Sequence, residues 1–214
     1  MLSASPLAHK FKSVVVAGAA AAAVLVPAGA ASADSGSTSA KTEVMSTQSA
    51  QKDVSAQASR KLYDIRLRVK PNNAKYLGRP WKPSEAVGQL KKCFNCTFPV
   101  KNAPKKYPKK GQLIKLRACA AGPFGCKNAP VKFYEQKNGF YFIAQKGHFD
   151  GAGSKIYFQF YNEKKTGYLG LHVWAYVTKP TVPDSVNKSV ARGTWQDFAH
   201  KMGVKLHCKH SSQC

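Results

Sequence analysis

The sequence predicts a mainly β protein, in which a small antiparallel barrel or sandwich is followed by a short C-terminal helix. Three observations carry this prediction. Apolar residues alternate with period two in several short stretches, an Asn-Gly turn separates two of them, and helical spacing replaces the alternation near the C-terminus. Short strands joined by turn residues are typical of small all-β domains.

The first predicted strand covers residues 61–70, where apolar residues alternate with mostly cationic ones: Tyr63, Ile65, Leu67 and Val69 against Asp64, Arg66, Arg68 and Lys70. This alternation predicts a half-buried strand with a positive outer face. Residues 76–110 are predicted to be irregular, because five prolines interrupt them and proline cannot donate to a strand ladder.

Further strands are predicted over residues 112–118, 131–136, 140–145, 155–161 and 168–177. The turn at 137–139 reads Lys-Asn-Gly, and Asn-Gly between apolar runs is a strong hairpin signal because both residues tolerate positive φ. In the last strand, one face is aliphatic and the other carries Tyr168, His172, Trp174 and Tyr176.

The C-terminal segment predicts a short helix. Thr194 precedes an apolar face with helical spacing, formed by Trp195, Phe198, Ala199 and Met202, and Gly203 follows as the residue that ends the helix. This helix is expected to pack on the sheet.

The stretch from Leu113 to Val177 resembles a bacterial SH3-type domain of exported cell-wall proteins. Such domains open with a strand like Ile114-Lys115-Leu116-Arg117 before a Gly-Pro turn, and close with a strand like the one that runs from Gly167 to Val177. The resemblance implies an SH3-like barrel and binding to the cell wall. One departure is Gly139-Phe140-Tyr141, where these domains usually have Gly-x-Trp.

The N-terminus has the pattern of a secretory signal peptide. Residues 1–12 carry two Lys and no acid, residues 13–26 are apolar, and Ala31-Ser32-Ala33 gives a small-x-small cleavage pattern. The apolar run is shorter than the roughly 20 residues that a membrane-spanning helix needs. We therefore expect cleavage between Ala33 and Asp34, and a secreted protein without a membrane span.

Three parts are predicted after cleavage. Residues 34–60 are rich in Ser, Ala, Thr and Gln, which predicts a disordered tether. Residues 61–180 form a basic β domain, and residues 181–214 hold the helix and a disulfide-closed tail.

The chain is strongly basic, with 34 Lys and Arg against 10 Asp and Glu and a formal net charge of +24. Removal of residues 1–33 takes away two Lys and no acid, which leaves +22. Residues 61–179 alone hold 24 bases and 5 acids. A charge of this size attracts polyanions and disfavours a metal cage of carboxylates, so no metal and no cofactor is predicted.

Six cysteines in a secreted chain predict a disulfide framework: Cys93, Cys96, Cys119, Cys126, Cys208 and Cys214. The simplest of the fifteen connectivities joins neighbours along the chain. Two alternatives stay open: the first pair could be a redox CxxC motif, and the tail from His207 to Cys214 contains metal-ligating residue types, although its spacing matches no zinc pattern.

The charge and the aromatic strand face predict a non-enzymatic module that binds an anionic extracellular polymer, either a cell-wall glycan or teichoic acid, or a nucleic acid. Aromatic rings stack on sugars and bases while cations hold phosphate or carboxylate groups. The candidate binding residues are Tyr168, His172, Trp174, Tyr176, Arg66, Arg68 and Lys70. In the alternative interpretation, these aromatics pack under the helix, against Trp195 and Phe198.

The alternative function is a secreted antibacterial toxin or nuclease. In it, His148 acts with Asp150 or Glu135 as an acid–base pair, and lysines hold phosphate. We expect binding rather than catalysis, because the sequence has no nucleophile motif, P-loop or HExxH, and a Gly-rich turn around His148 also fits a surface loop.

Overall fold

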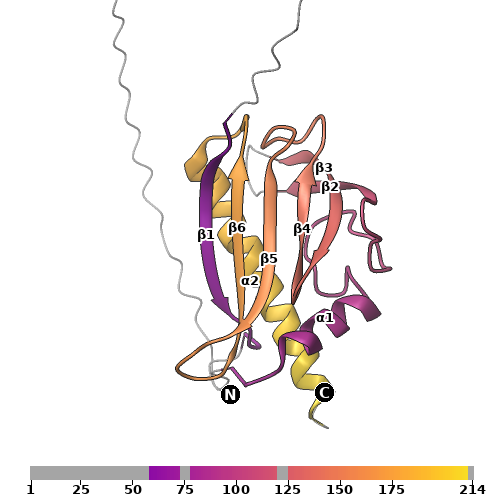
Figure 1. Cartoon of the computed structure of the whole chain (residues 1–214), viewed down its shortest axis with the longest axis vertical. Helices are drawn as coiled ribbons and strands as arrows, with labels where there is room; N and C mark the ends of the chain where they lie inside the picture. The colour runs from indigo at the N-terminus through magenta and orange to yellow at the C-terminus, as the bar shows by residue number, and fades with distance from the viewer. Residues whose placement is uncertain (1–57, 73–77, 120–124, 212–214) are drawn as a thin grey trace, which may run out of the picture. The chain divides into compact units, whose positions relative to one another are not determined.

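The computed structural model describes residues 58–72, 78–119 and 125–211, which belong to one compact unit of the chain. The predicted signal peptide and nearly all of the predicted tether lie outside these residues. Figure 1 shows the elements in their order along the chain: β1 (Arg60–Arg68), α1 (Pro83–Lys92), β2 (Leu113–Cys119), β3 (Cys126–Gln136), β4 (Gly139–Ala144), β5 (Lys155–Asn162), β6 (Leu169–Val177) and α2 (Asp184–Lys209).

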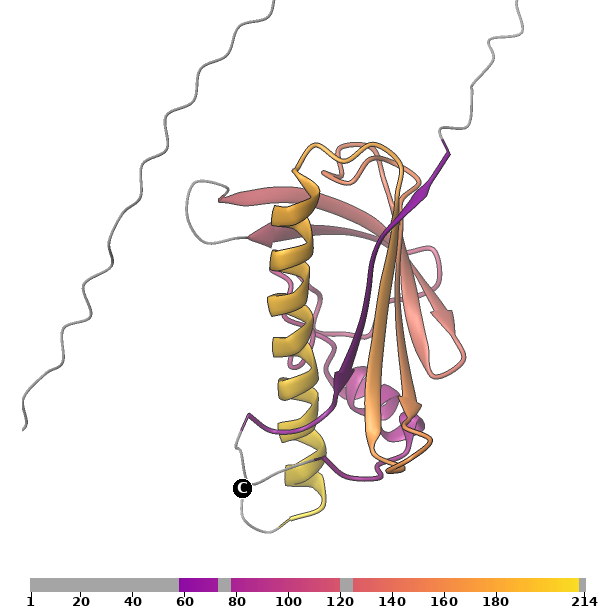
Figure 2. The same ribbon diagram turned by 90° about the vertical axis from the view of Figure 1, so that its left-hand side faces the viewer.

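The six strands form one antiparallel sheet in the order β1-β6-β5-β4-β3-β2. Among the strands of the described residues, only β1 and β6 pair although they are far apart in sequence. β1 and β2 lie at the two edges and do not pair with each other, so the sheet is open. β2 and β3 curve away from the other strands towards α2 (Figure 2).

The predicted mainly β class is confirmed, but the predicted SH3-like barrel and the resemblance behind it are wrong. Residues 113–177 supply five strands of an open sheet, and β1 extends that sheet beside β6. The matched motifs lie in real strands, β2 and β6. Strand patterns of this kind identify which residues face a core, but not which edges pair.

The predicted alternation is visible in the sheet. In β1, Tyr63 and Ile65 are buried while Asp64 and Arg66 are exposed. The β3–β4 hairpin turns at Asn138, whose φ of 58° is the left-handed conformation that the Asn-Gly pattern predicted. The face of the sheet towards α2 is called the inner face, and the opposite one the outer face.

The C-terminal helix is much longer than predicted, because α2 contains 26 residues. Thr194 does not cap it: its hydroxyl donates to the carbonyl of Val190 at 2.8 Å, one turn earlier in the same helix. Gly203 does not end it either. Gly203 faces the chain just after β1, where a Cβ atom would clash with the backbone of Lys70.

Helix α1 lies within the stretch that was predicted to be irregular. Pro83 occupies the first turn of this helix, where the missing N–H costs nothing. The Glu85 carboxylate accepts the backbone N–H of Lys82 at 3.0 Å and so caps the helix start. Proline at this position therefore marks the start of a helix and does more than interrupt a strand.

One hydrophobic core lies between the inner face and α2. Aromatic rings dominate its centre, where Phe98, Phe158, Trp195 and Phe198 contact one another with ring centroids between 4.8 and 6.2 Å apart. The indole N–H of Trp195 donates to the hydroxyl of Tyr63 at 3.2 Å, which links α2 to β1. No helix of the described residues is long and apolar enough to cross a membrane.

The structure contains the disulfides Cys93–Cys96 and Cys119–Cys126, which join neighbouring cysteines along the chain. Cys208 is also disulfide-bonded, while Cys214 lies outside the described residues. Disulfides of this kind are typical of an oxidising compartment. No free cysteine is left among the described residues to act as a metal ligand, whereas a Cys93–Cys96 disulfide is also the oxidised form of a redox CxxC motif, so the redox interpretation stays a prediction.

Candidate functional site

A cavity of about 440 Å³ lies between the inner face and α2, and is called the inner cavity below. Its walls are mainly apolar side chains of the sheet, of the segment between α1 and β2, and of α2. Among them are Phe98, Leu116, Val131, Phe142, Ile156 and Trp195. Three alanines also line it, Ala118, Ala129 and Ala191. Small side chains at these positions leave volume unfilled that a larger residue would occupy.

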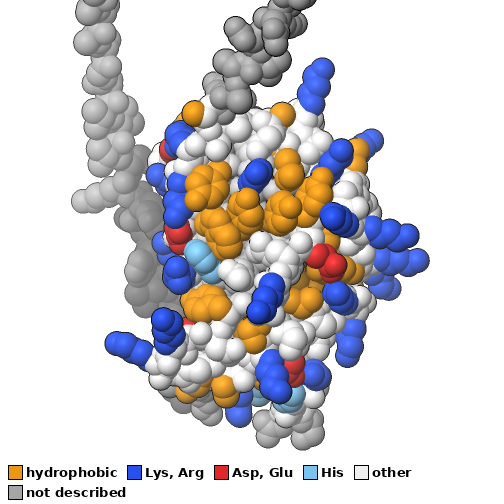
Figure 3. All heavy atoms as spheres, in the orientation of Figure 1, with side chains coloured by type: hydrophobic (Ala, Val, Ile, Leu, Met, Phe, Trp, Pro, Cys, Tyr) orange, Lys and Arg blue, Asp and Glu red, His pale blue; other side chains and the backbone are white. Residues whose placement is uncertain are grey.

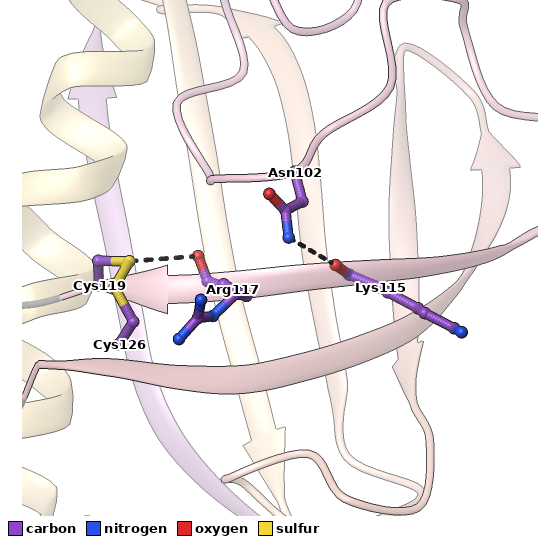
Figure 4. The surroundings of a disulfide bond; sticks show 5 residues. All are labelled: Asn102, Lys115, Arg117, Cys119 and Cys126. Atoms are coloured by element: carbon purple, nitrogen blue, oxygen red, sulfur yellow. Dashed lines mark hydrogen bonds between the residues drawn. A yellow bond between two sulfur atoms is a disulfide. The ribbon is translucent and has the colours of Figure 1, made fainter.

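The second disulfide forms part of the lining of the inner cavity. Cys119 and Cys126 are cross-strand partners at the end of the β2–β3 hairpin, and both line the cavity. Figure 4 shows this disulfide beside Arg117, whose carbonyl oxygen lies 4.0 Å from the Cys119 sulfur. Lys101 forms an isolated bridge with Arg117, so two exposed cations stand at this part of the lining.

A small polar group lines another part of the inner cavity and consists of His148, Asp150 and Asn187. Asn187 lies in the first turn of α2, and its amide donates to Asp150 Oδ1 at 2.5 Å. His148 Nδ1 accepts the backbone N–H of Asp150 at 3.0 Å. The side chains of His148 and Asp150 are only 4% and 5% exposed.

The loop between β4 and β5 is built to hold this group. Gly151 has a φ of 89°, and the Ser154 hydroxyl donates to the Asp150 carbonyl at 2.7 Å. A left-handed residue here closes the turn tightly, which glycine tolerates best. The loop is therefore fixed under the start of α2, and His148 is not the surface-loop residue that its Gly-rich surroundings suggested.

Burial shifts both titratable groups, in opposite directions. Burial lowers the pKa of His148 to about 4. Burial raises the pKa of Asp150 to about 6, against the opposing effect of the Asn187 hydrogen bond and with a smaller contribution from the charge of Asp184. At neutral pH His148 is uncharged, so the 3.9 Å separation of Nδ1 from Asp150 Oδ2 is not an ion pair.

The second candidate region is a row of rings on the outer face, called the outer row: Tyr134, Tyr141, Tyr157 and Trp174. Each ring comes from a different strand, and neighbours are direct cross-strand partners. Their centroids are 5.1, 5.2 and 4.9 Å apart. The ring of His172, two residues before Trp174 on β6, lies 4.4 Å from the Trp174 ring.

The outer row exposes ring edges rather than ring faces. Tyr157 and Trp174 lie 3° from parallel at a centroid distance too short for rings placed side by side, so their faces cover each other. Figure 3 shows hydrophobic side chains gathered on the outer face, with Lys and Arg around them. A sugar or base therefore meets mainly edges and flanking cations here.

The structure separates the predicted binding residues into two groups. His172, Trp174 and Tyr176 lie half-buried on the outer face, and Arg66 is the cross-strand partner of His172. The alternative, in which these aromatics pack under α2, is wrong because α2 covers the inner face. His172 Nε2 lies 2.7 Å from Asp64, which also accepts a hydrogen bond from Lys61.

The other predicted residues lie away from this group. Arg68 makes a two-pronged ion pair with Glu163, at 2.9 and 2.6 Å, and its guanidinium lies over the ring of Tyr168. Lys70 follows β1 and lies against α2, where its carbonyl contacts His200 Nδ1 at 3.0 Å. The charge of Arg68 is thus largely compensated within the protein.

The enzyme alternative named two carboxylates for His148, and the structure brings only one of them to it. Asp150 lies beside His148, whereas Glu135 pairs with Lys91 at the surface. On another side, His148 lines a surface hollow together with Lys146 and Lys179. The described residues contain no cluster of three or more His, Cys, Asp or Glu side chains that could hold a metal ion.

Sequence reasoning missed the inner cavity, Asn187 and three members of the outer row. The strand alternation places Tyr141 and Tyr157 on the same face as Trp174, but only the strand order shows that they are neighbours. Asn187 and Asp150 are 37 residues apart and belong to no motif.

No model of a known protein family matches the chain, and no curated protein matches its sequence. Among solved structures, Ara h 8.0201 is similar with a TM-score of 0.44 and 10% identity, covering 70% of this chain and 99% of that one. A START superfamily protein from Mycobacterium smegmatis reaches 0.42 and 12%, covering 69% and 96%. The major latex-like protein 151 from Panax ginseng reaches 0.41 and 11%, covering 72% and 98%. None of the three is described as an SH3-type domain, and scores below 0.5 do not establish a shared fold.

Proposed function

We propose that this protein binds a small, mostly apolar molecule in the inner cavity. The observation that carries the proposal is the cavity itself, about 440 Å³ with an apolar lining and a few polar groups. Ligand sites in proteins usually have volumes of roughly 300–1,000 Å³ and this kind of lining. Removing an apolar ligand from water there contributes roughly 25 cal/mol for each Å² buried.

The proposed setting is extracellular. The disulfides fit an oxidising compartment, and the N-terminal sequence pattern predicts export. A binding protein of this kind holds a poorly soluble molecule outside the cell and shields it from water.

Titration with the neutral apolar dye N-phenyl-1-naphthylamine tests the proposal. We expect a saturable rise in fluorescence, and loss of that rise in Ala191→Phe, because the larger side chain fills the inner cavity. Val204→Phe is the matched control, since Val204 lies on the same helix but is 44% exposed and does not line the cavity. Equal binding by both variants, at unchanged melting temperature, would place the dye elsewhere and contradict the proposal.

We also propose, as a second function, that the outer face binds an anionic extracellular polymer. The observation that favours it is the outer row with exposed cations beside it, such as Arg66, Lys132 and Lys155. Edges of aromatic rings are electropositive, so edges and cations both favour anionic groups. The polymer is a teichoic acid, an acidic glycan or a nucleic acid.

Binding to purified cell walls and to DNA over a series of NaCl concentrations tests this second function. Affinity should fall as salt rises, with a clearly negative log–log slope. Lys132→Glu with Lys155→Glu should weaken binding, whereas Lys205→Glu on exposed α2 should have a smaller effect. Salt-independent binding would refute the electrostatic basis, and cleavage of DNA or RNA in the same incubation would favour the toxin or nuclease alternative.

A further inference from the structure

We propose that the ligand of the inner cavity carries a protonated amine that binds the carboxylate of Asp150. This inference rests on the proposed ligand-binding function and names the chemical class of the ligand. It assigns the polar group of the cavity a recognition role, with Asp150 as the acceptor and Asn187 as the residue that orients it.

The hydrogen bonds of Asp150 leave one carboxylate oxygen without a donor. Oδ1 accepts the amide of Asn187 at 2.5 Å. Oδ2 has His148 Nδ1 as a polar neighbour at 3.9 Å, beyond hydrogen-bonding distance. Nδ1 already accepts the Asp150 backbone N–H and so carries no proton to donate. Within the described residues Oδ2 accepts no hydrogen bond, and it keeps some accessible surface, because the fully buried side-chain atoms without a partner there are Thr97 Oγ1 and Tyr107 Oη.

A buried carboxylate with one hydrogen bond is costly, because desolvation of the charge is repaid only in part. Its side chain is 5% exposed, so little water reaches it. A ligand ammonium group placed at Oδ2 makes a charge-assisted hydrogen bond in a poorly solvated site, where such bonds are strongest. The same position offers nothing to a ligand carboxylate, which would meet a like charge.

Other charged groups near Asp150 act more weakly on the ligand. Asp184 adds negative charge from the start of α2, but pairs with Arg60 at 2.7 Å and is partly exposed. The hydroxyl of Tyr63 stays neutral, because burial raises its pKa. Lys146 and Lys179 stand at the surface hollow behind His148.

Two cations of the cavity lining, Lys101 and Arg117, favour the opposite preference. Lys101 and Arg117 are exposed and therefore screened by solvent and salt, whereas Asp150 is not. The net charge of the whole chain, +24, also favours anions. A preference for an amine over an acid with the same tail thus points to Asp150, because general electrostatics would give the reverse.

The test compares decylamine, decanol and decanoate, which share one alkyl tail and differ in the head group. Each displaces N-phenyl-1-naphthylamine from the intact protein at neutral pH. We expect decylamine to bind about tenfold more tightly than decanol, as for one charge-assisted hydrogen bond. Asp150→Asn should remove the preference for decylamine over decanol, while the control Asp184→Asn should keep it.

Wild-type protein alone gives a second, independent measurement that needs no variant. Between pH 8 and pH 5 the amine stays charged, but Asp150 takes up a proton near its pKa of about 6. Decylamine affinity should then fall by about tenfold at pH 5 while decanol affinity stays constant.

Three outcomes would overturn the inference. If decylamine and decanol bind equally in wild type at every pH, the cavity binds apolar molecules without selectivity for the head group. The inference is then wrong, while the proposed function still holds. If decanoate binds most tightly, Lys101 and Arg117 select the head group. If none of the three displaces the dye and the dye itself does not bind, the proposed function fails as well.

Discussion

His148 and Asp150 affect the stability of the fold in opposite ways as the pH changes. The pKa of His148 is lowered, so the unfolded chain binds more protons at this residue between about pH 4 and pH 6.5, and stability rises with pH. The pKa of Asp150 is raised, so the native state binds more protons between about pH 4 and pH 6, and stability falls with pH. The two contributions largely cancel in the wild type.

Substitution of either residue should expose the contribution of the other. The free energy of unfolding of Asp150→Asn, minus that of the wild type, should rise by on the order of 3 kcal/mol from pH 4 to pH 6, because the wild type loses this stability as Asp150 ionises. The same difference for His148→Gln should fall by a similar amount over this range. Urea unfolding at several pH values measures both, and changes of equal sign in these two differences would refute this assignment of the shifts.

At the scale of single residues, alternation predicted that His172, Trp174 and Tyr176 share one face of a strand, because that needs only local information, but it left open whether this face points outward or lies under the helix. Sequence reasoning named His148 and Asp150 as a pair but placed them in a surface loop. Their burial depends on Asn187, which reaches Asp150 from α2 across 37 residues. No local pattern encodes such a contact.

Among the elements, α2 contains two glycines with opposite roles. Gly203 lies against the backbone of Lys70, and a Cβ atom there would clash with atoms that cannot rotate away. Gly193 is exposed, and a methyl group at this position would meet no other part of the protein within 4 Å.

Alanine at these two positions should therefore change stability in opposite directions. Gly203→Ala should cost about 2–3 kcal/mol, since α2 and the chain after β1 must move apart. Gly193→Ala should add about 0.5–1 kcal/mol, because alanine restricts the unfolded chain and favours helix. Thermal unfolding of the two variants tests this, and a stable Gly203→Ala protein would show that the close approach does not hold the fold together.

The Cys119–Cys126 disulfide should matter for both stability and binding. It closes a short loop, for which the chain-entropy model gives about 2 kcal/mol, and it lines the inner cavity. Replacing both cysteines by alanine should lower the melting temperature and weaken dye binding. Replacing Cys93 and Cys96, which do not line the cavity, should affect only the melting temperature. Equal dye affinity in both variants would show that the Cys119–Cys126 disulfide does not affect ligand binding in the cavity.

The elements themselves were largely predictable, and their assembly was not. The six strands and the turn at Asn138 follow from alternation and turn chemistry. Helix α1 was not predicted, because its first residue is a proline, which in the sequence alone indicates irregular structure. The length of α2 was underestimated, because Gly203 has the pattern of a helix end, whereas it allows close packing against Lys70. The inner cavity requires β1 to pair with β6 and the β2–β3 hairpin to curve towards α2, and both are long-range choices.

For the whole molecule, the excess of positive charge is the property that the sequence defines best. Residues 61–179 carry 24 bases and 5 acids, and the ion pairs within this range neutralise only part of the positive charge. Like charges spread over one compact unit repel one another and lower the free energy of unfolding. The same field attracts the polyanions of the second proposed function.

Added salt should therefore stabilise this protein. Screening shortens the range of repulsion to about 10 Å at 0.1 M salt, while the surface ion pairs that it also weakens contribute little each. We expect NaCl to raise the free energy of unfolding by on the order of 1 kcal/mol, which corresponds to a melting temperature about 2–4 °C higher for a chain of this size. Comparing NaCl with sodium phosphate at equal ionic strength separates screening from anion binding: equal shifts indicate screening alone, and a larger shift in phosphate indicates a site for anions on the folded protein. A melting temperature that falls as NaCl rises would mean that the ion pairs outweigh the repulsion, and would contradict the electrostatic account.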